Sequence, residues 1–355
     1  MPDSDGPISS QQRDLLALGA NMDVLPRAHG QPLASGLMRH EPRDFIVTEI
    51  LPFPLSGAGE HLYLKIRKTG QNTRWVVRQL AKHFGLPFRS VGFAGLKDRH
   101  AIAEQWFSLH FAGKPDPYLK NTGIDGVEIV DSLRHSGKLR RGMLAGNRFR
   151  ITLRNLSGDL DDLQARLTTL GSEAVPNYFG AQRFGKQAGN LDLLNLPDTG
   201  RAADREARSF GLSALRSALF NGYLGERIDD DSWQRSLSGE IVYDASGRVY
   251  RHSDALTDSQ ARYQSTGLLW GCGENQATGP ALARESEYFG RFPDVTALLA
   301  AYKVRMMRRP LSLHLPDLDW TLSGDSLQLT FTLGRGMYAT AVLREIANVC
   351  EAAAH

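Results

Sequence analysis

The sequence has few features that would tie it to a membrane, a disulfide framework or a metal. Only two of its 355 residues are cysteines, Cys272 and Cys350, which lie far apart. Their number and spacing exclude a disulfide framework and a cysteine-based zinc site. Apolar runs are short and broken by charges, so none approaches the ~20 residues of a membrane helix. The amino terminus lacks a basic start followed by an apolar block, so we expect no secretory signal, no membrane association and a cytoplasmic protein.

Motifs for cofactors and for several enzyme classes are also missing. The ten histidines are scattered without a His-Glu-x-x-His spacing, and we predict no metal. Gly271-x-Gly273 and Gly334-x-Gly336 complete neither G-x-G-x-x-G nor a phosphate loop, which disfavours a nucleotide cofactor. No G-x-S-x-G occurs, so a serine hydrolase of the elbow type is unsupported. We therefore expect no cofactor.

The length of 355 residues fits two domains, or one domain with a large insertion. Hydrophobic residues make up 41% and charged residues 23%, which are values typical of a folded globular chain. The composition changes near Val175–Gly180, and we expect a second domain between that point and Pro310.

Charge is unevenly distributed along the chain. The net charge is only +3, yet no acidic residue occurs between Ser132 and Gly158. A local basic surface of this kind suits a phosphate backbone. A solvated face that merely aids solubility would have the same composition. The basic residues of this window are Arg134, Lys138, Arg140, Arg141, Arg148, Arg150 and Arg154.

Hydrophobic periodicity predicts strands and helices without strict alternation, which favours an α+β fold over a doubly wound sheet. Within 60–67, Leu62, Leu64 and Ile66 share one face, so we expect a half-buried strand whose other face is polar. Residues 1–33 are expected to be irregular. The expected strands are 44–50, 60–67, 105–111, 148–154 and 327–333, and the expected helices are 72–84, 156–170, 212–227 and 338–350.

One stretch places a carboxylate, Asp98, between the cations Lys97 and Arg99, on a connection from a helix to a strand. A carboxylate close to cations stays ionised and suits nucleophilic or base chemistry. Gly92 and Gly95 permit positive φ and close approach of a ligand. A charged triplet alone is more often a solvated turn. The stretch reads Val91-Gly92-Phe93-Ala94-Gly95-Leu96-Lys97-Asp98-Arg99-His100-Ala101.

Two further segments are compatible with either a core or an RNA-binding surface. Asn177–Gly185 combines aromatic residues, an amide, Arg183 and glycines. Aromatic rings and arginine can stack on RNA bases and bind the RNA backbone, whereas a domain hinge would bury the same rings. Phe149 alternates with Ile151 and Leu153 and should face the core, unless it lies at a strand edge beside a pocket.

Taken together, these segments resemble the TruD family of tRNA pseudouridine synthases. The Asp98 stretch resembles the catalytic motif of the family, and the other segments agree in order along the chain. Any one match would be weak, but several in register are specific. The matching segments are Asp44–Glu49, Gly92–Arg99, Gly146–Phe149, Asn177–Gly185, Ser213–Asn221 and Phe331–Glu345.

The resemblance implies a fold and an activity. The fold would be α+β, with a pseudouridine synthase catalytic domain at 1–172 and 311–355 built on a mixed, largely antiparallel sheet. An α/β insertion domain at 173–310 would interrupt it. The enzyme would isomerise uridine to pseudouridine at position 13 of tRNA without a cofactor. We expect tRNA as the partner, no protein partner and a monomeric state.

The resemblance also implies roles for individual residues. Asp98 would be the catalytic carboxylate, flanked by Lys97 and Arg99, while Phe149 would stack on the target base and Asn147 would help to hold the site. A catalytically silent RNA-binding protein of the same fold is the alternative, and a hydrolase of free nucleosides is a third possibility. The residues expected to contact RNA are Lys138, Arg140, Arg141, Arg148, Arg150 and Arg183.

Overall fold

The computed structural model describes residues 8–99, 101–119, 122–185, 188–195, 202–244, 247–252 and 263–351. His100, which belongs to the Asp98 stretch, lies outside these residues, as do the first seven residues of the expected irregular segment. Among the described helices, none is both long enough and apolar enough to cross a membrane.

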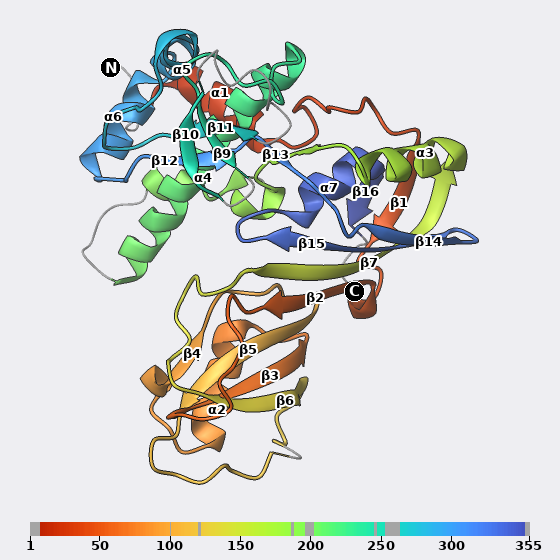
Figure 1. Cartoon of the computed structure of the whole chain (residues 1–355), viewed down its shortest axis with the longest axis vertical. Coiled ribbons are helices and arrows are strands. Elements are labelled where there is room, and N and C mark those ends of the chain that lie inside the picture. Colours follow the sequence, from red (N-terminus) through yellow and green to blue (C-terminus); the bar gives the residue numbers. More distant parts are fainter. Residues whose placement is uncertain are drawn as a thin grey trace, which may run out of the picture. The chain divides into compact units, whose positions relative to one another are not determined.

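The chain divides into two units (Figure 1). The sheet unit comprises Pro32–Ser172, Leu315–Gly336 and Ile346–His355. The helical unit comprises Met1–Gln31, Glu173–His314 and Met337–Glu345. The division into a catalytic domain and an insertion domain, with the boundaries expected from the sequence, stays a prediction.

The sheet unit contains β1 (Ala34–Met38), η1 (Pro42–Asp44), β2 (Phe45–Ile50), β3 (His61–Thr69), α2 (Thr73–His83), η2 (Phe88–Ser90), β4 (Val91–Phe93), β5 (Ile102–His110), β6 (Val127–His135), β7 (Gly146–Gly158), α3 (Leu160–Leu170), β14 (Asp319–Ser323), β15 (Ser326–Gly334) and β16 (Asn348–Glu351). The helical unit contains α1 (Ser10–Ala20), β8 (Val175–Pro176), η3 (Ala181–Arg183), η5 (Asp192–Asn195), α4 (Ala202–Asp229), β9 (Ile241–Asp244), β10 (Val249–Arg251), β11 (Tyr263–Leu269), α5 (Gly279–Gly290), α6 (Pro293–Ala301), β12 (Met307–Pro310), β13 (Ser312–Leu313) and α7 (Ala339–Ile346).

The main sheet has the strand order β14-β15-β7-β2-β5-β3-β6, with β1 beside β7, β16 beside β1 and β4 beside β5. The pairs β1–β16 and β2–β5 are parallel and the other pairs are antiparallel, so the sheet is mixed and largely antiparallel, as predicted. The long strand β7 pairs with β1, β2 and β15. It therefore connects segments that are far apart in the sequence.

Helix α2 covers one face of the sheet at β3 and β5. Leu62, Leu64 and Ile66 of β3 pack there in one buried cluster with Val76 and Leu80 of α2, as the periodicity of both segments predicts. A helix stripe with this spacing buries its apolar side against a sheet because burial removes apolar surface from water.

The opposite face of β3 is less exposed than the sequence predicts. Tyr63 is fully buried, packs with Leu139 and donates its hydroxyl to the carbonyl oxygen of Gly137 at 3.0 Å. A segment between β6 and β7 covers this face, and strand alternation contains no information about such a distant cover.

Three segments form other secondary structure than the sequence predicts. The segment expected to be irregular contains α1, which packs against α4 because Gly19 allows close approach to the backbone of Ala218. Leu156 belongs to β7, and the helix α3 begins only after Asp159, whose side chain accepts hydrogen bonds from two backbone amides of its first turn. The expected last helix ends at Ile346, and the chain then forms β16 beside β1.

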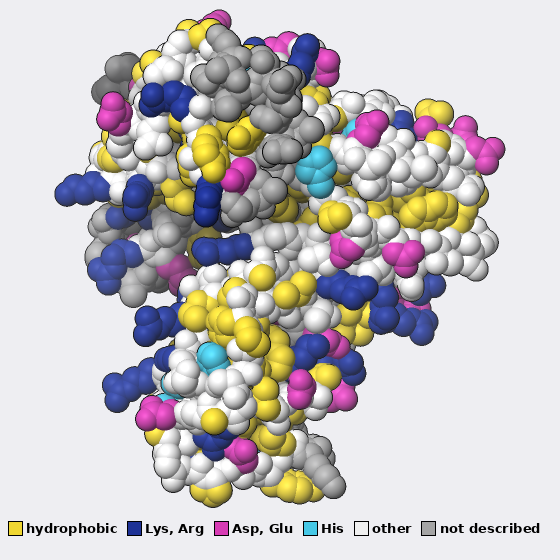
Figure 2. All heavy atoms as spheres, in the orientation of Figure 1, with side chains coloured by type: hydrophobic (Ala, Val, Ile, Leu, Met, Phe, Trp, Pro, Cys, Tyr) yellow, Lys and Arg dark blue, Asp and Glu magenta, His cyan; other side chains and the backbone are white. Residues whose placement is uncertain are grey.

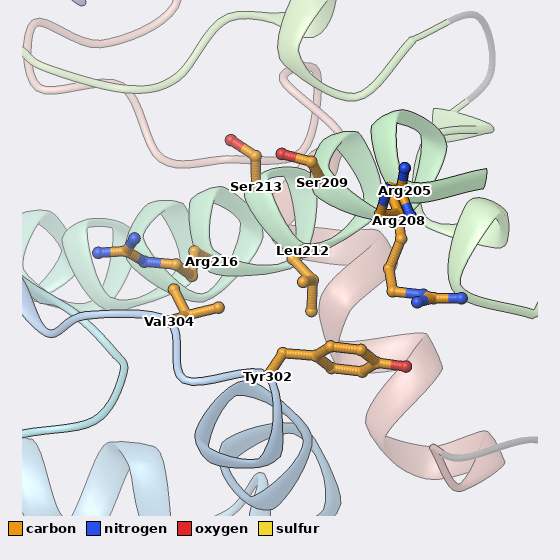
Figure 3. A pocket seen from close by; sticks show the side chains of 8 residues that line it. All are labelled: Arg205, Arg208, Ser209, Leu212, Ser213, Arg216, Tyr302 and Val304. Atoms are coloured by element: carbon orange, nitrogen blue, oxygen red, sulfur yellow. The ribbon is translucent and has the colours of Figure 1, made fainter. Parts of the chain in front are cut away.

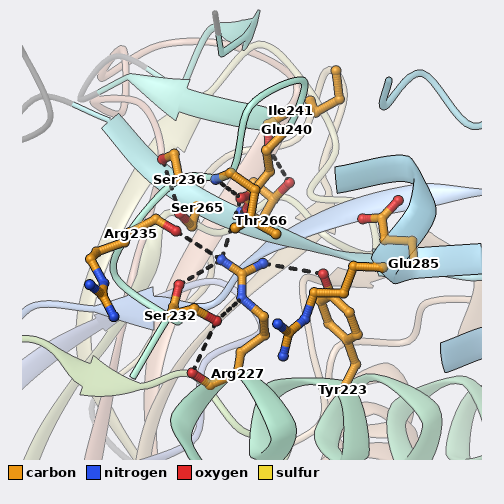
Figure 4. Close-up of polar contacts among 12 residues, drawn as sticks. Tyr223, Arg227, Ser232, Arg235, Ser236, Glu240, Ile241, Ser265, Thr266 and Glu285 are labelled. Atoms are coloured by element: carbon orange, nitrogen blue, oxygen red, sulfur yellow. Dashed lines mark hydrogen bonds and ion pairs between the residues drawn. The ribbon is translucent and has the colours of Figure 1, made fainter. Parts of the chain in front are cut away.

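The centre of the helical unit is α4, which is longer than the helix predicted at 212–227. Near its end, the fully buried Arg227 donates to the carbonyl oxygen of Ser232 at 2.6 Å and to the hydroxyl of Tyr223 at 3.2 Å (Figure 4). The carboxylate of Glu240 lies 3.4 Å from Arg227, and burial raises the pKa of Glu240. This network ties α4 to the segment that leads into β9.

Candidate active site

Asp98 lies on the connection between β4 and β5, and not directly after the helix α2 as expected. Strand β4 has only three residues with Gly92 in the middle, so no periodicity reveals it. A side chain at Gly92 would overlap the carbonyl oxygen of Leu139, which explains the glycine. Positive φ does not, because neither Gly92 nor Gly95 has one.

The cation that binds the carboxylate of Asp98 is Arg39, which directly follows β1. Its Nη2 lies 3.0 Å from Oδ2 of Asp98, and its Nη1 lies 2.6 Å from the Glu351 carboxylate on β16. The Arg39 side chain is 12% exposed and that of Asp98 is 35% exposed, so a nearly buried guanidinium holds a partly open carboxylate. Arg39 has a φ of 60°, which a residue with a side chain rarely adopts. No local sequence pattern marks Arg39.

Lys97 and Arg99 flank Asp98 in the sequence but bind other groups. Lys97 Nζ lies 2.9 Å from Oε2 of the buried Glu49 on β2. Arg99 Nε donates to the carbonyl oxygen of Gly70 at 3.0 Å. The ion pair that we expected from these two cations is made by Arg39 instead, because successive side chains of an extended loop point in different directions. Glu49 ends one of the matching segments, which is the signal that could have identified it.

Lys68 is fully buried on the same face of β3 as Leu64 and Ile66, and its amine binds the backbone of Asp98. Its Nζ donates to the carbonyl oxygen of Asp98 at 2.6 Å and to that of Gln71 at 2.8 Å. Burial lowers the pKa of Lys68 to about 8. The side-chain amide of Gln105 on β5 donates to the carbonyl oxygen of Gly95 at 2.6 Å. The loop that carries the carboxylate is therefore anchored at both ends by buried side chains.

Asn147 stands opposite Glu49 in the β2–β7 pair. Its Oδ1 is buried and accepts no hydrogen bond from the described part of the chain. A buried acceptor without a donor is unfavourable, so this oxygen suits a ligand that brings an N–H group. Glu49, the cross-strand neighbour of Asn147, binds Lys97 of the Asp98 loop, so Asn147 lies one strand away from the residue that holds that loop.

Phe149 faces the core, as the alternation of its strand predicts, and 8% of it remains exposed. Its ring stacks on Phe331 at 5.6 Å between centroids and meets Phe45 edge-on at 6.0 Å. The guanidinium of Arg39 lies 4.6 Å from the centroid of Phe45. The cation that binds Asp98 thus also contacts this aromatic row, which forms an apolar wall beside the ion pair.

Part of the basic window is neutralised within the sheet unit. Arg154 Nη2 lies 2.7 Å from Oδ1 of the buried Asp44, and Arg134 Nε lies 2.6 Å from Oδ1 of Asp116. These two arginines therefore stabilise the fold. On the face shown in Figure 2, acidic side chains also lie among the basic side chains of the described residues.

The residues expected to contact RNA are more accessible. Arg140, Arg141, Arg148 and Arg150 are exposed, and the guanidinium of Arg141 lies 4.5 Å from the ring centroid of Phe93. The half-buried Lys138 donates to the carbonyl oxygen of Arg89. Arg183, on η3 of the helical unit, is half-buried.

Comparison with known proteins identifies the fold and the family. A crystal structure described as tRNA pseudouridine synthase D from Methanosarcina mazei matches with a TM-score of 0.68, covering 96% of this chain and 98% of that chain. At 19% identity this likeness shows the fold alone, which is the predicted α+β pseudouridine synthase fold. The sequence model of the family tRNA pseudouridine synthase D (TruD) matches residues 23–194 and 201–346.

Individual relatives agree over nearly the full length. The tRNA pseudouridine synthase D of Methylococcus capsulatus is 43% identical over 333 residues, which cover 91% of this chain and 94% of the relative. The protein of the same name from Nitrosococcus oceani is 40% identical, with 94% of this chain and 96% of the relative covered. The chain therefore belongs to the TruD family of tRNA pseudouridine synthases, and the family resemblance inferred from the sequence is confirmed.

Proposed function

We propose that the chain isomerises uridine to pseudouridine at position 13 of tRNA, with Asp98 as the catalytic carboxylate. Family membership supports the reaction and the substrate class. The observation that carries the role of Asp98 is its partly exposed carboxylate, held 3.0 Å from a nearly buried Arg39 on a loop anchored by Lys68. A charged group that is fixed before the substrate arrives suits catalysis, because no reorganisation is needed during the reaction.

The reaction breaks the bond from N1 to C1′, turns the uracil and joins C5 to C1′. A proton leaves C5 and another is taken up at N1, so atoms and electrons balance without a redox partner. Asp98 can attack C1′, add to C6 or remove a sugar proton. Each route uses the carboxylate of Asp98, which the Arg39 guanidinium holds at 3.0 Å.

The neighbouring residues suit a flipped uracil. Taking the target nucleotide out of its stack costs a few kcal/mol, which contacts in the site must offset. The buried Oδ1 of Asn147 can accept the N3–H of the base. Phe149 would contact the ring, although only 8% of it is exposed, so its stabilisation falls at the low end of the usual ~1–3 kcal/mol. Lys97 and Arg99 would hold the loop rather than the carboxylate.

Affinity for the rest of the tRNA would come from cations that meet phosphates, a sequence-independent and salt-sensitive interaction. A silent RNA-binding protein could use the same cations, but it would have no use for a partly exposed carboxylate such as Asp98, which repels phosphates. The proposed phosphate contacts are Lys138, Arg140, Arg141, Arg148, Arg150 and Arg183.

Release of tritium from unmodified tRNA that carries [5-³H]uridine tests this function. We expect the purified protein to release tritium from tRNA with uridine at position 13, and none above background from a matched tRNA labelled only at its other uridines. Equal release from both positions would refute the assignment of position 13. Free uracil among the products would instead indicate a hydrolase. Salt-sensitive tRNA binding without any release would indicate a silent RNA-binding protein.

A further inference from the structure

The helical unit carries a cationic pocket of its own, with a volume of about 500 Å³ (Figure 3). One stripe of α4 lines it, together with Tyr302 and Val304 from the segment after α6. The residues of the stripe are spaced three or four apart, so they share one face of the helix. They are Arg205, Arg208, Ser209, Leu212, Ser213 and Arg216, and no carboxylate is among the described residues that line the pocket.

Carbonyl and hydroxyl groups, rather than acids, hold the arginines at one end of this pocket. Arg216 Nη2 donates to the carbonyl oxygen of Leu269 at 3.1 Å, and Arg183 Nη1 donates to Oγ of the pocket residue Ser213 at 2.9 Å. The Nε atoms of Arg183 and Arg216 are both buried and lack a hydrogen-bond partner among the described residues. Two buried donors of interacting arginines are thus unsatisfied, which is unfavourable unless a ligand accepts them.

The arginines at this end of the pocket act on one another electrostatically. Burial lowers the pKa of Arg216, and the charge of Arg183 lowers it further. Burial also lowers the pKa of Arg309, to about 9, with Arg183 adding to the shift. The guanidinium groups of Arg309 and Arg183 lie 4.1 Å and 5.2 Å from the centroid of Phe179. Two cations that repel each other thus lie near the ring of Phe179, and a bound anion would reduce that repulsion.

We propose that this pocket binds phosphodiester groups of the RNA substrate, an assignment that rests on the proposed function. Guanidinium groups form bidentate hydrogen bonds with phosphates, and serine hydroxyls add single donors. The ligand class is therefore a polar anion and not an apolar small molecule.

The spacing of the pocket arginines favours several phosphates of one RNA strand over a single phosphate as the ligand. In Figure 3, Arg216 lies at one end of the stripe and Arg205 and Arg208 lie at the other, with Leu212 and Tyr302 between them. At about 1.5 Å per helical residue, the stripe extends for about 16 Å. Neighbouring phosphates of one nucleic-acid strand are about 3.4 Å apart along a duplex axis. A pocket for one small anion would instead converge its cations on one point.

The salt dependence of tRNA binding tests the proposal. The variant R208Q/R216Q should bind unmodified tRNA about tenfold more weakly for each guanidinium that hydrogen-bonds a phosphate. The slope of log affinity against log salt concentration should become shallower by about 1 to 2. A control variant, R235Q/R248Q, removes two charges from the same unit outside the pocket, and its affinity and slope should stay near those of the wild type.

An affinity and slope in R208Q/R216Q equal to those of the control would overturn the proposal. If the double variant does not fold, two single variants repeat the test. Arg208→Gln should bind tRNA more weakly than the wild type, and the charge-conserving Arg216→Lys should bind tRNA with nearly normal affinity. Inorganic phosphate distinguishes the two sources of anion. Phosphate binding that is lost in the variant while tRNA affinity stays unchanged would make this a small-anion site and refute the RNA assignment.

Measuring both tRNA affinity and tritium release separates binding from catalysis. At saturating tRNA, R208Q/R216Q should release tritium with a kcat like that of the wild type and a raised KM, because the pocket residues lie outside the catalytic loop. If the wild type releases no tritium yet the shallower salt slope is found, the proposed function fails and the phosphate pocket stands. If tritium is released and the salt slope does not change, the proposed function stands and the phosphate pocket fails.

Discussion

Lys68 should make the stability of the sheet unit depend on pH. Burial lowers its pKa from 10.5 to about 8, so between these values the unfolded chain holds a proton that the folded protein has lost. Stability therefore rises with pH across this window, and the gain disappears again as pH falls through 8. At about 1.4 kcal/mol for each pKa unit, the rise between about pH 7.5 and about pH 10 is about 2 kcal/mol.

Urea unfolding followed by tryptophan fluorescence measures this effect. Lys68→Met removes the titrating group. The free energy of unfolding of the wild type minus that of Lys68→Met should therefore grow by about 2 kcal/mol between the two pH values, because contributions that both proteins share cancel. Lys82→Met on the exposed side of α2 is the matched control and should follow the wild type. Parallel profiles for the wild type and Lys68→Met would refute the argument that burial holds this amine partly neutral.

Three further predictions concern single contacts. Arg227→Met leaves Glu240 buried without its partner and should lower the free energy of unfolding by about 3–5 kcal/mol in urea titrations; a loss of less than about 1 kcal/mol would show that the pair is not needed. Arg39→Gln should reduce turnover of saturating tRNA about 100-fold, with Arg39→Lys less affected, and an unchanged rate in the Gln variant would remove Arg39 from the mechanism. Gly92→Ala should lower the stability of the protein by about 1–3 kcal/mol. Gly95→Ala should leave the stability nearly unchanged, because its added carbon meets only Lys97 Nζ at 3.9 Å. Equal melting temperatures of the two variants would contradict the packing argument.

The elements predicted best from sequence are those with strong local patterns. The helix α2 and the strands β7 and β15 repeat apolar residues at the spacing of their own structure, and each was located to within a few residues. Motif matches in register indicated the family, which the comparisons confirm. Local pattern and family resemblance were sufficient for the fold class because both are properties of contiguous segments.

The rest depends on contacts between distant segments. Arg39 reaches Asp98 because β1 pairs with β7 and β16, and no pattern around Arg39 indicates that pairing. Lys68 lies in phase with the apolar positions of its strand, and nothing in that pattern indicates that its amine donates to the Asp98 loop. The chain after α7 forms a strand only because β1 offers it an edge. Charge partners and covered faces are tertiary properties, so the candidate site was predicted only in part.

The proposed reaction depends on Asp98, and single-turnover tritium release with excess enzyme tests that dependence most directly. The wild type and Asp131→Asn, which changes an exposed carboxylate of β6, should release tritium at the same rate. Asp98→Asn should release none while binding tRNA within about twofold of the wild type and unfolding at the same urea concentration. Release by Asp98→Asn at the wild-type rate would contradict the catalytic role, and loss of both binding and fold would make Asp98 a structural residue instead.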